Sequence, residues 1–253
     1  GVGRRRIGHL HRRHRHALSA TDHLVAGVDH LVVMATSLAE GAAWCEATLG
    51  VTPGPGGEHP LMGTHNRLIN IASPTFPTAY LEIIAINSVA IRTYPARANR
   101  WFDMDNPVLS ERVAQQGPQL IHWVASVPNI NAAVQPLAAQ GIDRGVALEA
   151  SRMTPHGLLQ WQITVRDDGQ RLFDGCLPTL IQWGSAHPTN SMPHSGVTLQ
   201  ALQLSHLKAP ALQIACRSIG LTSIPVQPAP ARITATLQTP KGLIDIHSDI
   251  HSS

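Results

Sequence analysis

Hydrophobic and polar residues follow a strand–helix–strand pattern in the stretch Gly27–Val51. The first eight positions alternate, so that His30 shares one face with valines while the positions between them form the other face. Thr36 or Ser37 can then cap a helix, in which apolar residues recur at helical spacing until Gly50. This pattern predicts a strand, an amphipathic helix that ends at the glycine, and a second strand.

The same pattern returns twice along the chain. The second copy has a predicted strand at Gln119–Ser126, with His122 in its middle, and a helix at Ile130–Gln140. The third copy has a strand at Val197–Ser205 and a helix at Ala209–Ile219. The remaining pattern predicts strands at Arg67–Ile71, Ala79–Ile86, Arg144–Ala150, Leu158–Val165, Leu180–Trp183, Ile224–Gln227, Ile233–Gln238 and Leu243–His247, and a connecting helix at Pro107–Gln116.

These repeats predict an α+β fold made of βαβββ modules. Two modules are expected to pair into a cup-shaped mixed sheet, and a third, degenerate module is appended. The first module with its connection spans residues 27–116, the second spans 117–190, and the third spans 191–253. Residues 1–26 are expected to form a disordered basic tail.

Charge changes this picture only at the N-terminal end. The net charge of the 253 residues is +3, but residues 1–16 contain six arginines, four histidines and no acid. The rest of the chain is slightly acidic, so we expect no nucleic-acid partner for the body. No apolar run is long enough to span a bilayer, and three scattered cysteines indicate reduced thiols, so we expect a cytoplasmic protein without a membrane partner.

Four polar side chains occupy matching places in the first two modules. His30 matches His122 in the first strands, and Glu82 matches Gln182 in the last strands. If the two modules pair, these side chains converge inside the cup and form a divalent-metal site, suited to Zn, Ni, Mn or Fe(II). The alternative for each histidine is a hydrogen-bonded residue of the core.

The order of four motifs resembles the glyoxalase-like branch of the vicinal oxygen chelate superfamily. These motifs are VDHLVV, a helix ending in LGV, HPLMGTHN and YLEIIA, and the resemblance covers residues 27–247. It implies a metal held by His30, Glu82, His122 and Gln182, and lyase, isomerase, extradiol dioxygenase or thiol-transfer chemistry. In glyoxalase I the carboxylate at the position of Gln182 also moves a proton, which an amide cannot do, so glyoxalase I activity itself is not expected.

Two further histidines are candidates for catalysis. His59 and His65 lie in a glycine-rich loop, EHPLMGTHN, of the kind that covers a pocket mouth; the alternative is a structural turn. Trp123 and Trp183 are expected to face away from the cup, because they alternate with His122 and Gln182.

The expected function is therefore that of a metal-dependent enzyme acting on a small carbonyl or diol substrate, of the lyase, isomerase or dioxygenase class. The alternative is a non-catalytic small-molecule-binding protein with the same fold. A homodimer is possible, because a third module has no partner within the chain. Hydrolase and phosphate-binding sequence signatures are absent.

Overall fold

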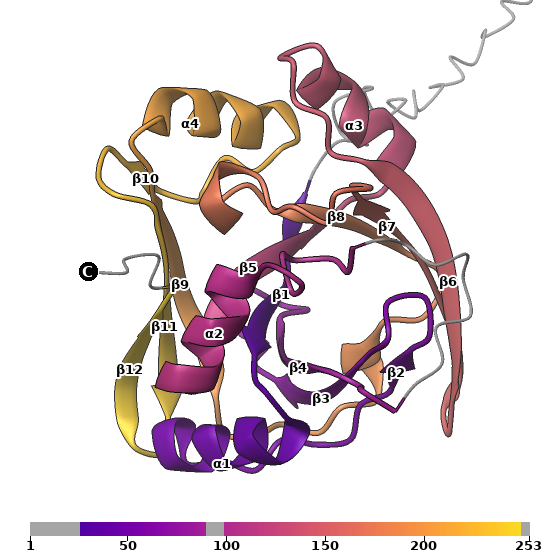
Figure 1. Cartoon of the computed structure of the whole chain (residues 1–253), viewed down its shortest axis with the longest axis vertical. Coiled ribbons are helices and arrows are strands. Elements are labelled where there is room, and N and C mark those ends of the chain that lie inside the picture. Colours follow the sequence, from indigo (N-terminus) through magenta and orange to yellow (C-terminus); the bar gives the residue numbers. More distant parts are fainter. Residues whose placement is uncertain (1–25, 90–98, 249–253) are drawn as a thin grey trace, which may run out of the picture.

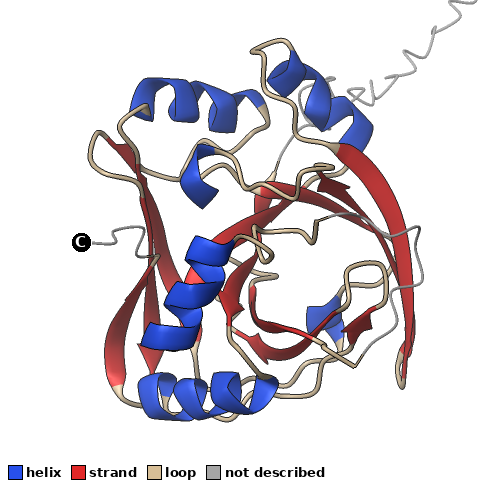
Figure 2. Ribbon diagram, viewed as in Figure 1, coloured by secondary structure: helices blue, strands red, loops and turns tan. Residues whose placement is uncertain are grey.

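The computed structural model describes residues 26–89 and 99–248. The tail predicted at residues 1–26 lies almost entirely outside the described residues. Within them, no helix is long and apolar enough to cross a membrane. The structure is an α+β fold with a curled eight-stranded sheet, a smaller four-stranded sheet and four α-helices (Figures 1 and 2).

Each half of the large sheet is one βαβββ unit. The first comprises β1 (Gly27–Met34), α1 (Leu38–Leu49), β2 (Glu58–His59), β3 (Thr64–Asn70) and β4 (Tyr80–Ile86). The second comprises β5 (Gln119–Ser126), α3 (Ile130–Ala138), β6 (Val146–Thr154), β7 (Gly157–Val165) and β8 (Thr179–Trp183), and α2 (Pro107–Gln116) connects the two units. The predicted order of elements is confirmed, including the helix at 107–116.

The two units join through their first strands. The strand order is β2-β3-β4-β1-β5-β8-β7-β6, with β1 and β5 antiparallel. Within each unit the first and last strands pair in parallel, β1 with β4 and β5 with β8. The two halves of the sheet therefore mirror each other about the β1–β5 junction and curl around a shared inner face, which confirms the predicted cup (Figure 1).

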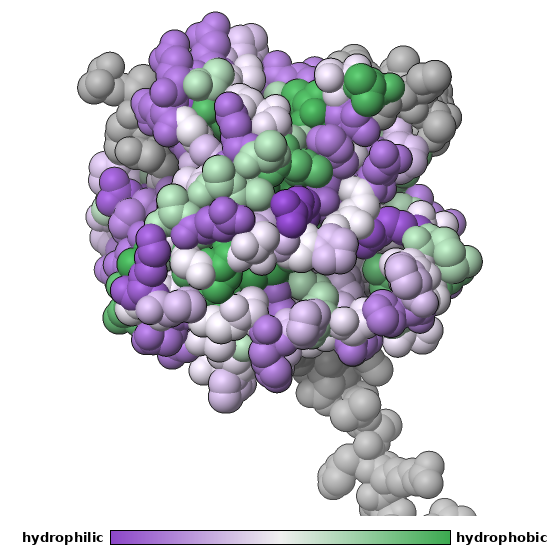
Figure 3. Space-filling model, turned by 90° about the horizontal axis from the view of Figure 1, so that it is seen from below, coloured by the Kyte–Doolittle hydropathy of each residue, from purple (hydrophilic) through white to green (hydrophobic). Residues whose placement is uncertain are grey.

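The third unit forms its own sheet. It comprises β9 (Thr198–Ser205), α4 (Ala209–Ser218), β10 (Val226–Gln227), β11 (Arg232–Thr239) and β12 (Gly242–His247), in the strand order β10-β9-β11-β12. Its apolar side chains share one buried core with the outer face of β1 and β5, including Leu31, Trp123 and Leu237. On the face shown in Figure 3, apolar side chains lie in small groups among polar ones.

Two irregularities in the β1–β5 pairing decide which side chains enter the cup. The register shifts between Val28 and His30 on β1, and again beside His122 on β5. Because a bulge inserts one unpaired residue, side chains on either side of it no longer alternate regularly. Val28 consequently joins Leu31 in the outer core, while His30 faces the inside.

Candidate functional site

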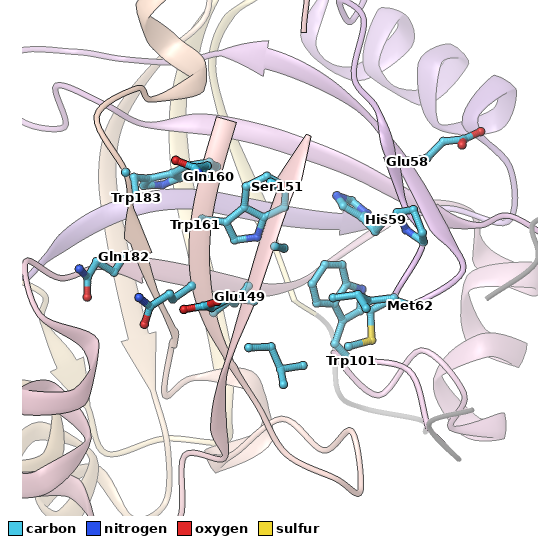
Figure 4. Close-up of a pocket in the computed structure, with 17 residues that line it drawn as sticks. Glu58, His59, Met62, Trp101, Glu149, Ser151, Gln160, Trp161, Gln182 and Trp183 are labelled. Carbon is cyan, nitrogen blue, oxygen red and sulfur yellow. The ribbon is translucent and has the colours of Figure 1, made fainter. Parts of the chain in front are cut away.

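Two adjacent cavities lie on the inside of the cup. The outer cavity, of about 620 Å³, is lined by residues that include Met62, Trp101, Trp161 and Trp183 (Figure 4). The inner cavity, of about 40 Å³, lies deeper and is lined by polar side chains of the first unit together with Arg152. The three tryptophans and His59 line both cavities, so the two cavities are adjacent and share these side chains as walls.

His30 and Glu82 face each other in the inner cavity. The strand pairing places Glu82 of β4 opposite Val32 of β1, one inward position away from His30. Nε2 of His30 lies 3.7 Å from Oε1 of Glu82, and both side chains are almost completely buried. The imidazole also stacks on the Tyr80 ring, with 4.5 Å between ring centroids and an interplanar angle of 15°.

Asp29 fixes the orientation of the His30 ring. Its carboxylate, with no exposed surface, accepts hydrogen bonds from His30 Nδ1 at 2.6 Å, His187 Nε2 at 2.8 Å and Trp183 Nε1 at 2.9 Å. Burial acts to raise the pKa of Asp29, but the hydrogen bonds from the two histidines hold it below its ordinary value. The hydrogen bond to this carboxylate holds His30 Nδ1 toward Asp29 and turns Nε2 toward the cavity.

Asn66 fixes Glu82 and His59 together. Its Oδ1 accepts a hydrogen bond from the Gly57 backbone N–H at 2.8 Å, which defines the orientation of the amide. Its Nδ2 then donates to Glu82 Oε2 at 2.6 Å and lies 3.2 Å from His59 Nε2. Burial lowers the pKa of His59 to about 4, so the ring is neutral near pH 7 and accepts at Nε2.

His122 does not join this group. Its Nδ1 donates to the Gly175 carbonyl at 2.7 Å, and its Nε2 contacts the Thr179 hydroxyl at 2.9 Å and the Thr179 backbone N–H at 3.2 Å. Both ring nitrogens are therefore occupied, and burial holds the pKa of His122 well below its ordinary value. The geometry is that of a hydrogen-bonded core histidine, not of a metal ligand.

Gln182 and His65 also lie away from His30 and Glu82. The Gln182 Oε1 accepts a hydrogen bond from the backbone N–H of Ile130 at the start of α3, on the far side of the outer cavity from His59 (Figure 4). His65 alternates with Asn66 on β3 and thus faces the other side of the sheet. The prediction that Trp183 faces away is wrong: it lines both cavities, whereas Gln182 lines only the outer cavity and its amide oxygen is bonded to the start of α3.

The second unit contributes no counterpart to the His30–Glu82 pair. Val124 lies opposite His30 across the β1–β5 pairing, and Ile181 and Trp183 are the inward residues at the end of β8. Among the residues that the structure describes, no three His, Cys, Asp or Glu side chains are grouped to hold a metal ion. The four-ligand arrangement predicted from the sequence is therefore not formed.

The remaining pair fits a cation held by two protein side chains with its other positions open. A histidine that binds metal usually donates its second ring N–H to a carboxylate, as His30 does to Asp29. Two ligands at about 2.1 Å from one ion lie roughly 3 to 3.4 Å apart, so the 3.7 Å separation of His30 and Glu82 needs only a small movement. Neither of these two facing atoms has a hydrogen bond to the described parts of the chain.

Arg152 is a residue of the site that the sequence did not indicate. It extends from β6 over Gly57, where an added Cβ atom would lie 2.1 Å from Nη1 of the guanidinium, so the arginine occupies space that the glycine leaves open. The guanidinium lines the inner cavity and makes no hydrogen bond or ion pair within residues 26–89 and 99–248. It is thus a cation available to a bound molecule.

Paired βαβββ units that curl around a common inner face define the vicinal oxygen chelate class of proteins. A family model described as the glyoxalase-like domain matches residues 28–219, and the chain belongs to this family. No curated protein sequence was found to match.

Several solved structures of low sequence identity match this chain. A hypothetical protein from Staphylococcus aureus has 13% identity and a TM-score of 0.55, over 90% of this chain and 88% of that one. Methylmalonyl-CoA epimerase of Streptomyces coelicolor, in complex with 2-nitronate-propionyl-CoA, has 13% identity and a TM-score of 0.39, over 63% of this chain and 96% of that one. The epimerase from Mycobacterium tuberculosis has 15% identity and a TM-score of 0.37, over 70% and 98%.

Proposed function

We propose that the protein is a metal-dependent enzyme that binds a divalent cation through His30 and Glu82 and acts on a small substrate with two chelating oxygens, a carbonyl or a diol. The observation that carries this proposal is the pair of facing donor atoms, His30 Nε2 and Glu82 Oε1, each fixed from behind by Asp29 or Asn66. The outer cavity, of about 620 Å³, is large enough for a small molecule.

The chain's own residues would hold and orient such a substrate. A bound cation would act as a Lewis acid on the substrate oxygen. His59 would contact the substrate, since it lines both cavities, and its neutral ring would orient rather than ionise the bound group. The tryptophan walls would exclude water from the reacting atoms, which strengthens electrostatic interactions there.

Metal binding is the first test of this function. A chain without residues 1–20, whose histidines could themselves bind metal, is expected to bind one divalent ion in calorimetric titrations with Zn, Ni, Mn and, without air, Fe(II). Preference for Fe(II) would favour the dioxygenase class, and preference for the others the lyase or isomerase class. If no ion binds at the His30–Glu82 pair, the protein is better assigned as a small-molecule-binding member of the fold.

Arg152 is expected to select anionic substrates. Asp29 and Glu82 carry two negative charges beside the single positive charge of Arg152, so the net charge of these three groups is −1. A bound divalent cation would raise it to +1, which suits a substrate with one negative charge. A series of 2-oxo acids should therefore bind at least about tenfold more tightly than their amides, a typical value for one charged hydrogen bond. Arg152→Met should remove that difference.

The matched control for this substitution is Arg217→Met, in the last turn of α4 and outside both cavities. It should leave the preference for acids unchanged. Equal affinity of the wild-type protein for acids and amides would contradict the role of Arg152, while the metal titration would still test the cation site separately.

A further inference from the structure

A buried arginine, Arg144, lines a small cavity beside the inner cavity. Arg144 follows α3, and its side chain is almost completely buried, with 3% of the residue exposed. It lines a cavity of about 10 Å³, here named the Arg144 cavity, whose lining includes Trp101, Phe102, Thr164 and Thr179. Trp101 and Phe102 also line the inner cavity, so these two rings form the wall between the two spaces.

The Arg144 cavity has an excess of hydrogen-bond donors. Nη2 of Arg144 donates to the Thr179 hydroxyl at 3.2 Å, but Nε and Nη1 have no partner in the described parts of the chain. Nε1 of Trp101 is also buried without a partner there. The Thr164 hydroxyl accepts from the Leu180 backbone N–H at 3.1 Å, so its own proton is free to donate. The donors that line the Arg144 cavity therefore lack a hydrogen-bond acceptor.

The charge of Arg144 is not neutralised by a direct ion pair with any residue that the structure describes. The carboxylates of the surrounding loops are used by other arginines: Asp103 binds Arg171 at 2.9 Å, and Asp168 binds Arg166 at 2.8 Å. Burial lowers the pKa of Arg144 to about 10, which leaves it charged near pH 7. An isolated buried charge is costly, so a counter-ion in this cavity would be strongly favourable.

We propose that the Arg144 cavity binds a small monovalent anion of halide size. The volume open to the centre of a water-sized particle is only about 10 Å³, close to the minimum for one water molecule, so phosphate and carboxylate groups do not fit and a halide, being larger than water, needs a small outward movement of the lining side chains. A water molecule would accept two of the orphaned hydrogen bonds but would leave the charge unneutralised. A chloride ion accepts from Arg144 and Thr164 and also neutralises the guanidinium. This site is separate from the proposed cation site and does not depend on it.

Halide-dependent stability tests the proposal in solution. Unfolding of the full chain would be followed in sodium chloride, sodium bromide and sodium gluconate at constant ionic strength. Chloride and bromide, but not gluconate, should stabilise the protein, and each tenfold rise above the dissociation constant should lower the unfolding equilibrium constant about tenfold. Arg144→Met should lose this dependence, while Arg217→Met should keep it. Equal unfolding in chloride and gluconate would overturn the proposal.

Crystals of the wild-type protein grown in sodium bromide give a second test, which stands whether or not Arg144→Met folds. An anomalous peak within hydrogen-bond distance of the Arg144 guanidinium supports the site. A water molecule at that position without anomalous signal overturns it.

Discussion

Replacing Glu82 by Gln is expected to weaken divalent-cation binding by more than 100-fold. Substitution of a residue that only hydrogen-bonds to a metal ligand usually costs 10- to 100-fold, and loss of a ligand should cost more. The substitution keeps the shape of the side chain, and its carbonyl oxygen can still accept the hydrogen bond that Asn66 Nδ2 donates to Glu82. The fold should therefore be retained, as measured by circular dichroism. Affinity would be measured by calorimetry on a chain without residues 1–20.

Variants at the two other predicted ligand positions provide the controls for Glu82→Gln. Gln182→Ala and His122→Gln should change cation affinity less than about threefold, because neither side chain faces the His30–Glu82 pair. His122→Gln should lower stability, because it disturbs the buried hydrogen bonds of the His122 ring to Gly175 and Thr179. If both of these variants lose cation binding while Glu82→Gln keeps it, the proposed His30–Glu82 site is wrong, and His122 and Gln182 are ligands as the sequence predicted.

Acid is expected to destabilise the protein between about pH 6.5 and pH 4. The pKa of His59 is about 4 in the folded protein against an ordinary value of 6.5, and that of His122 is also well below 6.5. As the pH falls, the unfolded chain takes up these protons first. His59 therefore lowers the free energy of unfolding by up to about 1.4 kcal/mol per pH unit within this window and not above it, and His122 acts in the same direction.

Urea unfolding at half-unit steps from pH 8 to pH 4 would measure this dependence. His59→Gln should reduce the slope by about one proton relative to the wild-type protein below pH 6.5, and leave it unchanged above pH 7. Parallel curves for the two proteins over the whole range would show that His59 is not buried in its neutral form.

The architecture could be predicted from the sequence because the same pattern of strand and helix occurs three times along the chain. Three copies of a strand followed by a capped helix, each closed by glycine-containing turns, predict three βαβββ units, and the observed elements follow this order. The helix at Pro107–Gln116 is bounded as predicted, with Asn106 as its N-cap. Pairing of the first strands, β1 with β5, then follows from placing two such units edge to edge.

The residues that face the inside of the cup were harder to predict, because they depend on which set of alternate positions in each strand points inward. The register shift between Val28 and His30 leaves Asp29 without a partner on β5, so its carboxylate can bind the His30 ring. Nothing in the sequence predicts this shift. In β8 the expected alternation is shifted by one, which exchanges Gln182 and Trp183. A one-residue shift moves every side chain to the other face, so module matching alone cannot select ligands.

Other site residues escape a sequence-based prediction because their roles are set by distant strands. Asn66 stands in the histidine-containing segment EHPLMGTHN, and alternation with His65 could have placed it inward beside Glu82. Arg152 gave no such signal: its approach depends on the missing side chain of Gly57, nearly a hundred positions earlier in the chain.

The two halves of the large sheet have unequal parts in the inner cavity. His30, Glu82 and Asn66 come from β1, β4 and β3, whereas Arg152 and Trp161 come from β6 and β7. Substitutions in the second half can thus reshape what the cup accommodates while the hydrogen-bonded centre built by the first half stays intact. A protein with this division of labour can acquire new ligands by divergence of one repeat alone.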